Sequence, residues 1–379
     1  MGSYRENEPS NRILIISLQG IGDVILITPL LTSLKRNIKD VKISVLTFRQ
    51  NKDVLVGNKN VDELICIDRK DANNPFKIIP LINRLRREKF KISICTYPGG
   101  PRTAFLSYLS GARERFGQDL NIFKKYRQFF TNLTPINEIK HAVLMNMDFM
   151  KLLGVNPGID NAVVSLNLSA EDETYVGKFL ESRGIEKNDK IIAIHPGCGE
   201  GTSRYRRWPM ERFVEVANYL SEKKGVKVVL IGGSDDLPAL DKISGKIAIK
   251  PVIAAGNLSI LQTAALLKRS IFLICNNSAP MHIAAAVGTP TISIFGPTDP
   301  RIHRPWGEGH IVLQKYHECC PCYYPFIGDT LEETGKRNSW FKKRFKCKSK
   351  DYRCLTSITV EDVAKATDRL LNDRILANG

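Results

Sequence analysis

Residues 271–300 read IFLICNNSAPMHIAAAVGTPTISIFGPTDP. The apolar run at 271–274 has the composition of a buried strand, and the run at 291–295 has the composition of another. The segment between them begins with polar helix-start residues, and Pro280 falls near the first helical position, where its missing N–H costs nothing. A helix of small residues over 281–287 then ends at Gly-Thr-Pro. The stretch therefore predicts a strand–loop–helix–strand unit.

The loop of this unit is a candidate phosphate site. Its residues Asn276, Asn277 and Ser278 precede the positive end of a helix, where free backbone N–H groups bind anions. The same pattern is also typical of an ordinary crossover whose helix is capped without any ligand. Both interpretations stay open on this stretch alone.

The rest of the chain repeats the alternation of strands and helices. Strands are predicted at 12–18, 42–47, 63–67, 92–96, 190–195 and 226–231. Such alternation is typical of parallel, doubly wound sheets. A chain of 379 residues is long enough for two domains, each with its own core. We place the first domain at 1–168 and the second at 169–379.

The charge balance limits the class of partner. The chain has 56 basic and 39 acidic side chains and a net charge of +17, which favours an anionic partner. The polar residues 1–12 do not resemble a signal peptide, and no apolar run reaches the roughly 18 residues that a spanning helix needs. We therefore expect a cytoplasmic protein, with the inner face of the cytoplasmic membrane as a candidate place of work.

Three ordered motifs resemble those of glycosyltransferase family 9, which includes the ADP-heptose:lipopolysaccharide heptosyltransferases. They are Gly-Ile-Gly-Asp-Val at 20–24, His-Pro-Gly through Trp-Pro at 195–209, and the stretch 276–300. The family's usual loop is close to Asn-Asp-Ser/Thr-Gly-Pro/Leu-Met/Ser-His, so Asn277 and Ala279 depart from it. The resemblance implies two Rossmann-like domains facing a cleft, the GT-B arrangement. It also implies that the first domain binds the acceptor and the second the nucleotide sugar.

The resemblance implies an inverting, metal-independent glycosyl transfer. The favoured donor is ADP-heptose, and the acceptor is a lipopolysaccharide-like or other anionic glycan. Asp23 would remove the proton from the attacking hydroxyl, although an Asp at a helix start is also a common cap. Arg206 stands two places before Trp-Pro, where the family commonly has Lys, and would stabilise the departing diphosphate. No cofactor is implied for catalysis.

Other residues are candidate contacts around these two groups. The donor candidates follow strands of the second domain: His195, Gly197, Thr202, Ser203, Arg207, Gly232, Gly233, Leu258, Asn277, Ser278, Ala279 and His282. The acceptor candidates follow strands of the first domain, at the edge where open α/β sheets bind ligands: Gly20, Gly22 and Arg102. For any single one of them, a structural role in a turn is the alternative.

A cysteine-rich, basic insertion is predicted at about 315–355. Its thiols Cys319, Cys322, Cys347 and Cys354 could close a structural four-thiolate zinc or iron site. The spacing resembles an insertion seen in many members of the family, and unligated thiols are the alternative. Lysines, arginines and aromatic rings alternate over 336–350, which is typical of a surface that contacts anionic lipid or a phosphorylated acceptor.

Two other classes of protein stay open. The basic aromatic stretch 113–141 could bind nucleic acid through stacking and phosphate contacts, although no usual nucleic-acid-binding motif is present. The departures at Asn277 and Ala279 leave room for a donor other than ADP-heptose. They also leave room for a sugar-nucleotide binder without catalysis.

Overall fold

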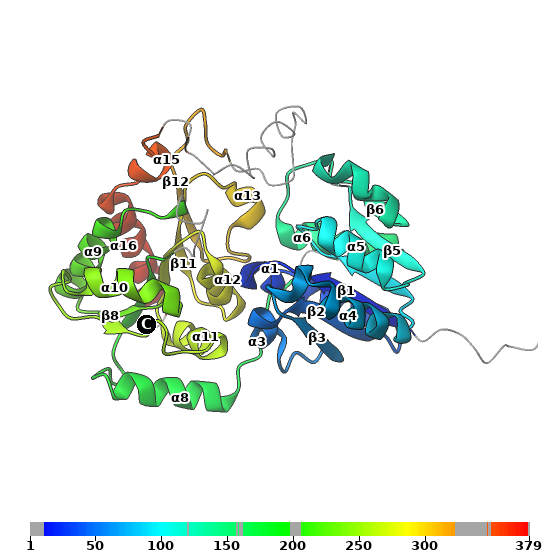
Figure 1. Ribbon diagram of the computed structural model, residues 1–379. Coiled ribbons are helices and arrows are strands. Elements are labelled where there is room, and N and C mark those ends of the chain that lie inside the picture. Colours follow the sequence, from blue (N-terminus) through cyan, green and yellow to red (C-terminus); the bar gives the residue numbers. More distant parts are fainter. Residues whose placement is uncertain are drawn as a thin grey trace, which may run out of the picture. The chain divides into compact units, whose positions relative to one another are not determined.

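The computed structural model describes residues 11–119, 121–156, 158, 162–197, 206–322, 347 and 350–377. The described residues up to Val164 form one compact unit, and those from Ser165 onward form a second. Each unit is built on a six-stranded parallel sheet with helices packed against it (Figure 1). The predicted doubly wound α/β fold is therefore confirmed. No helix of the described residues is long and apolar enough to cross a bilayer.

The first sheet has the strand order β3-β2-β1-β4-β5-β6. Its strands are β1 Arg12–Ser17, β2 Lys42–Phe48, β3 Glu63–Ile67, β4 Ile92–Cys95, β5 Glu114–Gln118 and β6 Asn132–Thr134. The central strand β1 is an almost continuous apolar run and is buried on both faces. The chain winds outward in both directions from β1 and β4, so the loops after these two strands border the crevice where such sheets bind ligands.

Helices and short helical turns connect these strands. They are α1 Ile21–Ile25, α2 Thr28–Asn37, η1 Arg49–Asn51, α3 Lys52–Leu55, η2 Asp71–Asn73, α4 Pro75–Arg87, α5 Pro101–Leu109, η3 Asn121–Phe129, α6 Ala142–Met147 and α7 Phe149–Leu152. The amide of Gln19 donates to the carbonyl of Pro98 (2.6 Å), and Asn51 donates to the carbonyl of Gln19 (2.9 Å). These two bonds join the loops that follow β1, β2 and β4.

The second sheet has the strand order β12-β11-β10-β7-β8-β9. Its strands are β7 Ile191–His195, β8 Lys227–Leu230, β9 Val252–Ile253, β10 Leu273–Asn276, β11 Thr291–Phe295 and β12 Ile311–Gln314. The helical segments are α8 Ala170–Glu181, α9 Met210–Asn218, η6 Tyr219–Lys223, η7 Ser234–Asp236, α10 Leu237–Ser244, α11 Ile260–Arg269, α12 Ala279–Ala286, α13 Pro300–His303, α15 Arg353–Thr356 and α16 Val360–Ala377. The predicted strand–loop–helix–strand unit is thus β10, α12 and β11.

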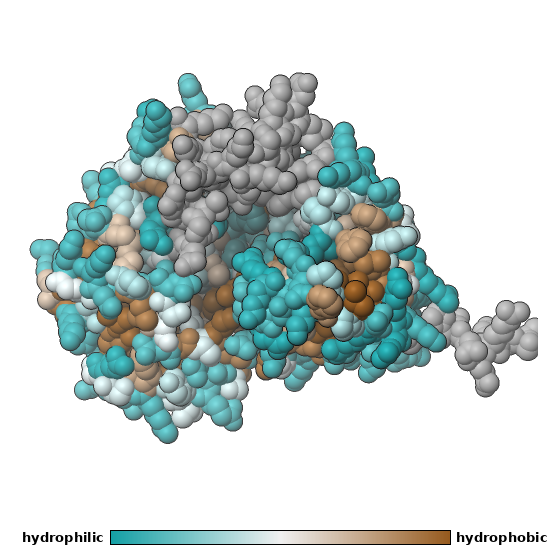
Figure 2. Space-filling model, in the orientation of Figure 1, coloured by the Kyte–Doolittle hydropathy of each residue, from teal (hydrophilic) through white to brown (hydrophobic). Residues whose placement is uncertain are grey.

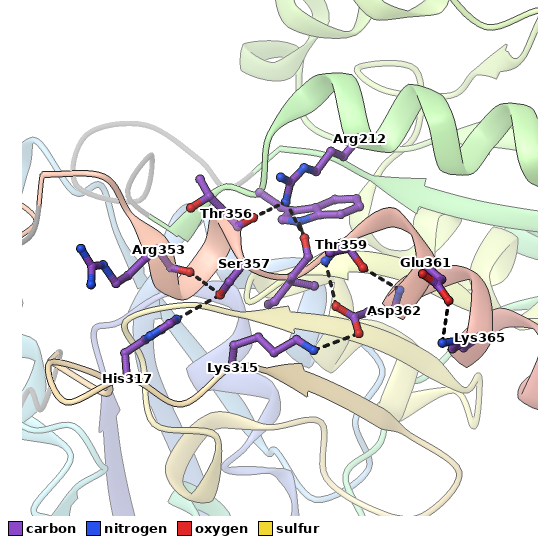
Figure 3. Close-up of polar contacts among 12 residues, drawn as sticks. Arg212, Lys315, His317, Arg353, Thr356, Ser357, Thr359, Glu361, Asp362 and Lys365 are labelled. Carbon is purple, nitrogen blue, oxygen red and sulfur yellow. Dashed lines mark hydrogen bonds and ion pairs between the residues drawn. The ribbon is translucent and has the colours of Figure 1, made fainter.

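The carboxyl-terminal helices are fastened to α9 by hydrogen bonds to the turn between α15 and α16. Arg212 donates to the carbonyls of Thr356 (2.6 Å) and Ile358 (2.5 Å), and the indole of Trp208 also donates to Ile358 (2.9 Å). Figure 3 shows Arg212 pointing at this turn. Thr359 caps the first turn of α16, because its N–H donates to the carboxylate of Asp362 and its hydroxyl accepts the N–H of Asp362. Trp208 is fully buried as a result.

A single buried side chain connects three segments at the carboxyl edge of the second sheet. The side-chain oxygen of Asn276 accepts the backbone N–H of Trp208 (2.9 Å). Its side-chain nitrogen donates to the carbonyls of Pro196 (2.8 Å) and Gly197 (3.1 Å). Asn276 therefore fixes the loop after β7 and the residues before α9 to the strand that leads into α12.

Replacing Asn276 by Ala should leave three buried backbone groups without their partners. We expect the free energy of unfolding of the second unit to fall by at least about 2 kcal/mol. Urea titration followed by tryptophan fluorescence measures this unit selectively, because the tryptophans, at 208, 306 and 340, lie after residue 165. Asn257→Ala is the matched control, because this exposed side chain donates to the nearby carbonyl of Ala255 and to no other described residue. Equal losses in both variants would contradict the assigned role.

Candidate functional site

The loop between β10 and α12 is the centre of the candidate donor site. Ser278 precedes the first residue of α12, but its side chain does not cap the helix. Its hydroxyl instead donates to the carbonyl of Asn276 (3.1 Å) and lies 3.0 Å from Nδ1 of His195. The N-terminal N–H groups of α12 are therefore not satisfied by the Ser278 hydroxyl, which is compatible with an anion at this position.

His195, the last residue of β7, connects Ser278 to a carboxylate. Its other ring nitrogen, Nε2, lies 3.3 Å from Oδ2 of Asp236, and both side chains are almost fully buried. His195 ends β7, while Asp236 and Ser278 follow β8 and β10, and these three strands are neighbours in the sheet. Sequence reasoning selected His195 and Ser278 but not Asp236. The available signal was its place three residues after Gly233, where an acidic side chain closes a helical turn.

The Asp236 carboxylate explains two of the predicted glycines. A Cβ atom at Gly197 would overlap this carboxylate, and one at Gly232 would lie 2.7 Å from Oδ2. The N–H of Gly233 donates to the same oxygen (3.1 Å). Gly197 and Gly232 were both predicted as donor contacts. In the structure, the absence of a Cβ atom at these two positions leaves room for the Asp236 side chain. This contact is enough to explain why both positions are glycine.

Charge around Asp236 keeps this carboxyl ionised. Burial by itself raises the pKa of Asp236, but the hydrogen bond and charge of His195, the N–H of Gly233 and the charge of Arg207 lower it. The net pKa lies below the usual value. Arg207 therefore lies close enough to Asp236 to interact with it electrostatically.

Two described basic residues stand just before α9. Arg206 and Arg207 are half-buried and stand directly before Trp208, which Asn276 and the carboxyl-terminal helices hold in place. The candidate donor residues Thr202 and Ser203 lie outside the described residues.

The remaining donor candidates have local structural contacts of their own. Asn277 is buried and donates to the hydroxyl of Thr298 (2.5 Å), so its amide ties the β10–α12 loop to the segment after β11. Ala279 is the half-buried first residue of α12, and His282 is buried in the same helix. Leu258 lies in the turn before α11, which is joined to the Gly232 loop because the N–H of Gly256 donates to Gly232 (3.1 Å).

In the first unit, Asp23 lies in α1 at the carboxyl edge of β1. Its Oδ2 accepts the N–H of Gly20 (3.1 Å), so the capping alternative considered for this residue is realised. The side chain is half-buried. Gly22 is buried in the same helix, while a Cβ at Gly20 would make only ordinary contact with Asp23 at 3.5 Å. Asp23 thus caps α1 and also lies at the edge of the sheet where such folds bind ligands.

Arg102, the remaining acceptor candidate, has a structural partner. Its guanidinium donates to the side-chain oxygen of Asn73 (2.8 Å), which joins the start of α5 to the turn before α4. Arg102 is half-buried in this position. This hydrogen bond is enough to explain why an arginine stands at position 102, even if it binds no ligand.

Two of the late cysteines, Cys320 and Cys354, contact each other directly. The thiol of Cys354 forms a hydrogen bond with Cys320, and this bond together with burial raises the pKa of Cys354. Cys320 in turn donates to the carbonyl of Gly296 (2.9 Å). Among the described residues, no group of three or more His, Cys, Asp or Glu side chains is arranged to hold a metal. The predicted set of Cys319, Cys322, Cys347 and Cys354 left out Cys320. Most of the basic segment 336–350 lies outside the part of the chain that the structure describes.

Comparison with known proteins agrees with this architecture. The family model described as glycosyltransferase family 9 (heptosyltransferase) matches residues 78–324. Lipopolysaccharide heptosyltransferase 3 of Escherichia coli is 32% identical over 302 residues, which cover 76% of this chain and 85% of that protein.

Solved structures share the fold over nearly the whole chain. The glycosyl transferase family 9 structure from Veillonella parvula DSM 2008 has a TM-score of 0.80 at 26% identity and covers 97% of this chain and 99% of its own. The E. coli ADP-heptose LPS heptosyltransferase II has a TM-score of 0.66 at 19% identity, with 88% and 100% of the two chains covered. These matches confirm the predicted two-domain GT-B fold. The chain therefore belongs to glycosyltransferase family 9 and is a glycosyltransferase that transfers a sugar from a nucleotide sugar.

Proposed function

We propose that this enzyme transfers heptose from ADP-heptose to a sugar hydroxyl of an anionic, lipopolysaccharide-like glycolipid, with inversion at the anomeric carbon and no catalytic metal. The observation that carries the proposal is the group formed by Asp236, His195 and Ser278 at the start of α12. The donor and acceptor are supported by similarity to a lipopolysaccharide heptosyltransferase and by the fold shared with an ADP-heptose-dependent one. We propose that the enzyme works in the cytoplasm, at the inner face of the cytoplasmic membrane.

In this proposal the diphosphate of the donor lies at the N-terminus of α12. Backbone N–H groups and the helix dipole favour negative charge there. The contacts of Nε2 with Asp236 and of Nδ1 with the Ser278 hydroxyl hold the ring of His195 in one orientation. His195 would therefore position Ser278 rather than react itself.

Two groups would act on the reacting atoms. Asp23 of the first unit would accept the proton of the attacking acceptor hydroxyl, with Gly20, Gly22 and Arg102 as candidate acceptor contacts. Arg206 would stabilise the negative charge that develops on the leaving diphosphate. Arg207 is the weaker candidate for that role, because the carboxylate of Asp236 already offsets part of its charge.

The nucleotide and the presence of turnover can be tested directly. A series of ADP-, GDP- and UDP-sugars should raise the melting temperature most with ADP-heptose, because a ligand that binds the native state stabilises it by mass action. A larger shift in melting temperature with another nucleotide sugar would identify that sugar, rather than ADP-heptose, as the donor. Binding without transfer or donor hydrolysis would favour a non-catalytic binder.

Asp23→Asn should lower kcat by about a hundredfold or more, which is the usual scale for removing a general base. Donor binding should be nearly unchanged, and the cap should persist because the amide oxygen can still accept the N–H of Gly20. Steady-state kinetics with ADP-heptose provide the measurement. Asp53→Asn is the control, because this residue also lies in the first turn of a helix in the same unit. Turnover within a few-fold of wild type would reduce Asp23 to its capping role.

Arg206→Ala should lower kcat by about 100- to 1,000-fold, since one lost electrostatic contact to a transition state typically costs about 3–4 kcal/mol. The adjacent Arg207 can make the loss smaller. The donor KM should change little, because the contact strengthens only as the bond breaks. Arg206→Lys should be milder, and Arg207→Ala should lower kcat less than Arg206→Ala. An unchanged kcat with a raised donor KM would show uniform binding instead.

The structural metal remains a prediction of the cysteine spacing, and no catalytic step depends on it. We expect elemental analysis to find about one zinc or iron per chain, which Cys322→Ser should remove and Cys320→Ser should retain. Comparing these two variants is informative because Cys320 lies outside the predicted set of ligands but contacts Cys354. If only the Cys320→Ser variant lost the metal, Cys320 would take the place of Cys322 as the metal ligand. Metal-free wild-type protein of normal stability would end the prediction.

A further inference from the structure

One helical layer of the first unit exposes apolar and aromatic side chains. The helices α4, α5 and η3 follow three successive strand connections in the same direction across the sheet, so right-handed crossovers put them on one face. Arg102 at the start of α5 bonds to Asn73 just before α4, and Arg86 near the end of α4 donates to Leu109 at the end of α5 (2.9 Å). The two helices therefore run side by side. We name α4, α5 and η3 together the basic aromatic layer.

The apolar part of this layer is unusually exposed. The exposed fractions are 84% for Phe76 and 56% for Ile79 on α4, and 48% for Phe105 and 50% for Tyr108 on α5. These are four of the nine large hydrophobic side chains that are exposed among the described residues. Figure 2 shows a hydrophobic area, in brown, over α4 and α5 with hydrophilic surface around it. An exposed apolar area of this kind marks an interaction surface.

Aromatic contacts extend this area onto η3. The ring of Phe129 packs against Phe105 (6.3 Å between centroids) and Tyr108 (5.3 Å), and it stacks with Tyr126 (6.2 Å). Tyr126 and Arg127 also line a small cavity with Gly99 and Gly100, which belong to the loop after β4. The layer therefore reaches the carboxyl edge of the sheet, where the proposed acceptor binds.

The charge of the layer has a single sign. Its three helices carry no Asp or Glu, and their basic residues are Lys77, Arg84, Arg86, Arg87, Arg102, Lys124, Lys125 and Arg127. Neighbouring acids reach only some of them, as in the pairs Arg84–Glu63 and Arg127–Asp119. Lys77, Arg87 and Lys124 are exposed and form no ion pair with a described residue.

We propose that the basic aromatic layer docks on an anionic phospholipid bilayer. The lysines and arginines would contact lipid phosphates, and Phe76 and Ile79 would insert among the headgroups, the combination typical of interfacial binding. Nucleic acid fits less well, because it offers no apolar phase for Ile79. The choice of a bilayer over another partner rests on the glycolipid acceptor of the proposed function. Docking would bring the carboxyl edge of the first sheet to the surface where that acceptor lies.

Sedimentation with lipid vesicles tests the proposal without any acceptor. The wild-type enzyme should bind vesicles of phosphatidylcholine with phosphatidylglycerol, and bind pure phosphatidylcholine far more weakly. Lys77→Glu/Lys124→Glu should weaken binding at least about tenfold, since each basic residue near an anionic surface contributes about fivefold. Phe76→Ser/Ile79→Ser should weaken it about tenfold by removing buried apolar area. Added salt should weaken wild-type binding through screening.

Matched variants of the second unit control for charge and for apolar area. Lys242→Glu/Lys246→Glu makes the same change of charge, and Ile249→Ser/Tyr316→Ser removes comparably exposed side chains. Both should bind vesicles like the wild type, and circular dichroism should show all four variants folded. Wild-type protein that ignores anionic vesicles would overturn the proposal. Equal binding by all variants, or a change only in oligomeric state or in RNA binding, would also overturn it.

A soluble acceptor separates this proposal from the proposed function. With a delipidated core oligosaccharide and ADP-heptose, the variants of the layer should retain wild-type kcat, because none of the altered residues belongs to the reaction site. Vesicle binding without heptosyl transfer would refute the reaction and leave the surface intact. Transfer to the soluble acceptor without vesicle binding would refute the surface alone.

Discussion

The second unit depends on one buried carboxamide. Asn276 offers a hydrogen-bond donor and an acceptor on the same side chain, and both bond to backbone groups of other segments. Because the group is fully buried, water cannot replace a lost partner, and each broken bond costs the desolvation of a backbone group. The loop after β7, the residues before Trp208 and the start of α12 are thereby fixed to one another.

A second buried polar group determines the residue types around it. The carboxylate of Asp236 needs space and positive charge, because burial disfavours its ionised form. Gly197 and Gly232 provide the space, and His195 and Arg207 provide hydrogen bonding and charge. Under the proposed mechanism, this leaves Arg206 and the N-terminus of α12 as the positive elements that serve the leaving diphosphate. The buried carboxylate therefore decides which cations are available to the ligand.

The first unit separates two kinds of surface. Its carboxyl edge is formed by loops, which Gln19 and Asn51 hold together and which present Asp23. Its basic aromatic layer is formed by the outer faces of helices, where side chains are not needed for the core. Loops can place reactive groups on a rigid scaffold, while a helical face offers the broad area that lipid contact requires. The aromatic turn η3 lies next to both surfaces.

The sequence by itself determined the buried strands, the order of the family motifs and the candidate residues Asp23, Arg206 and Ser278. Strands such as β1 and β11 were recognisable because burial on both faces makes them continuous apolar runs. The strands β5, β6, β9 and β12 were missed, since they are short or carry polar side chains.

Only the tertiary structure decided which polar groups meet. Asp236 contacts His195 across 41 residues, Asn276 bonds to Pro196 across 80, and Cys354 bonds to Cys320, which the predicted set of thiols left out. The first two contacts depend on the strand order β10-β7-β8, which brings distant loops to one edge of the sheet. Local composition and spacing carry no information about that order, because it results from how the strands pack against one another.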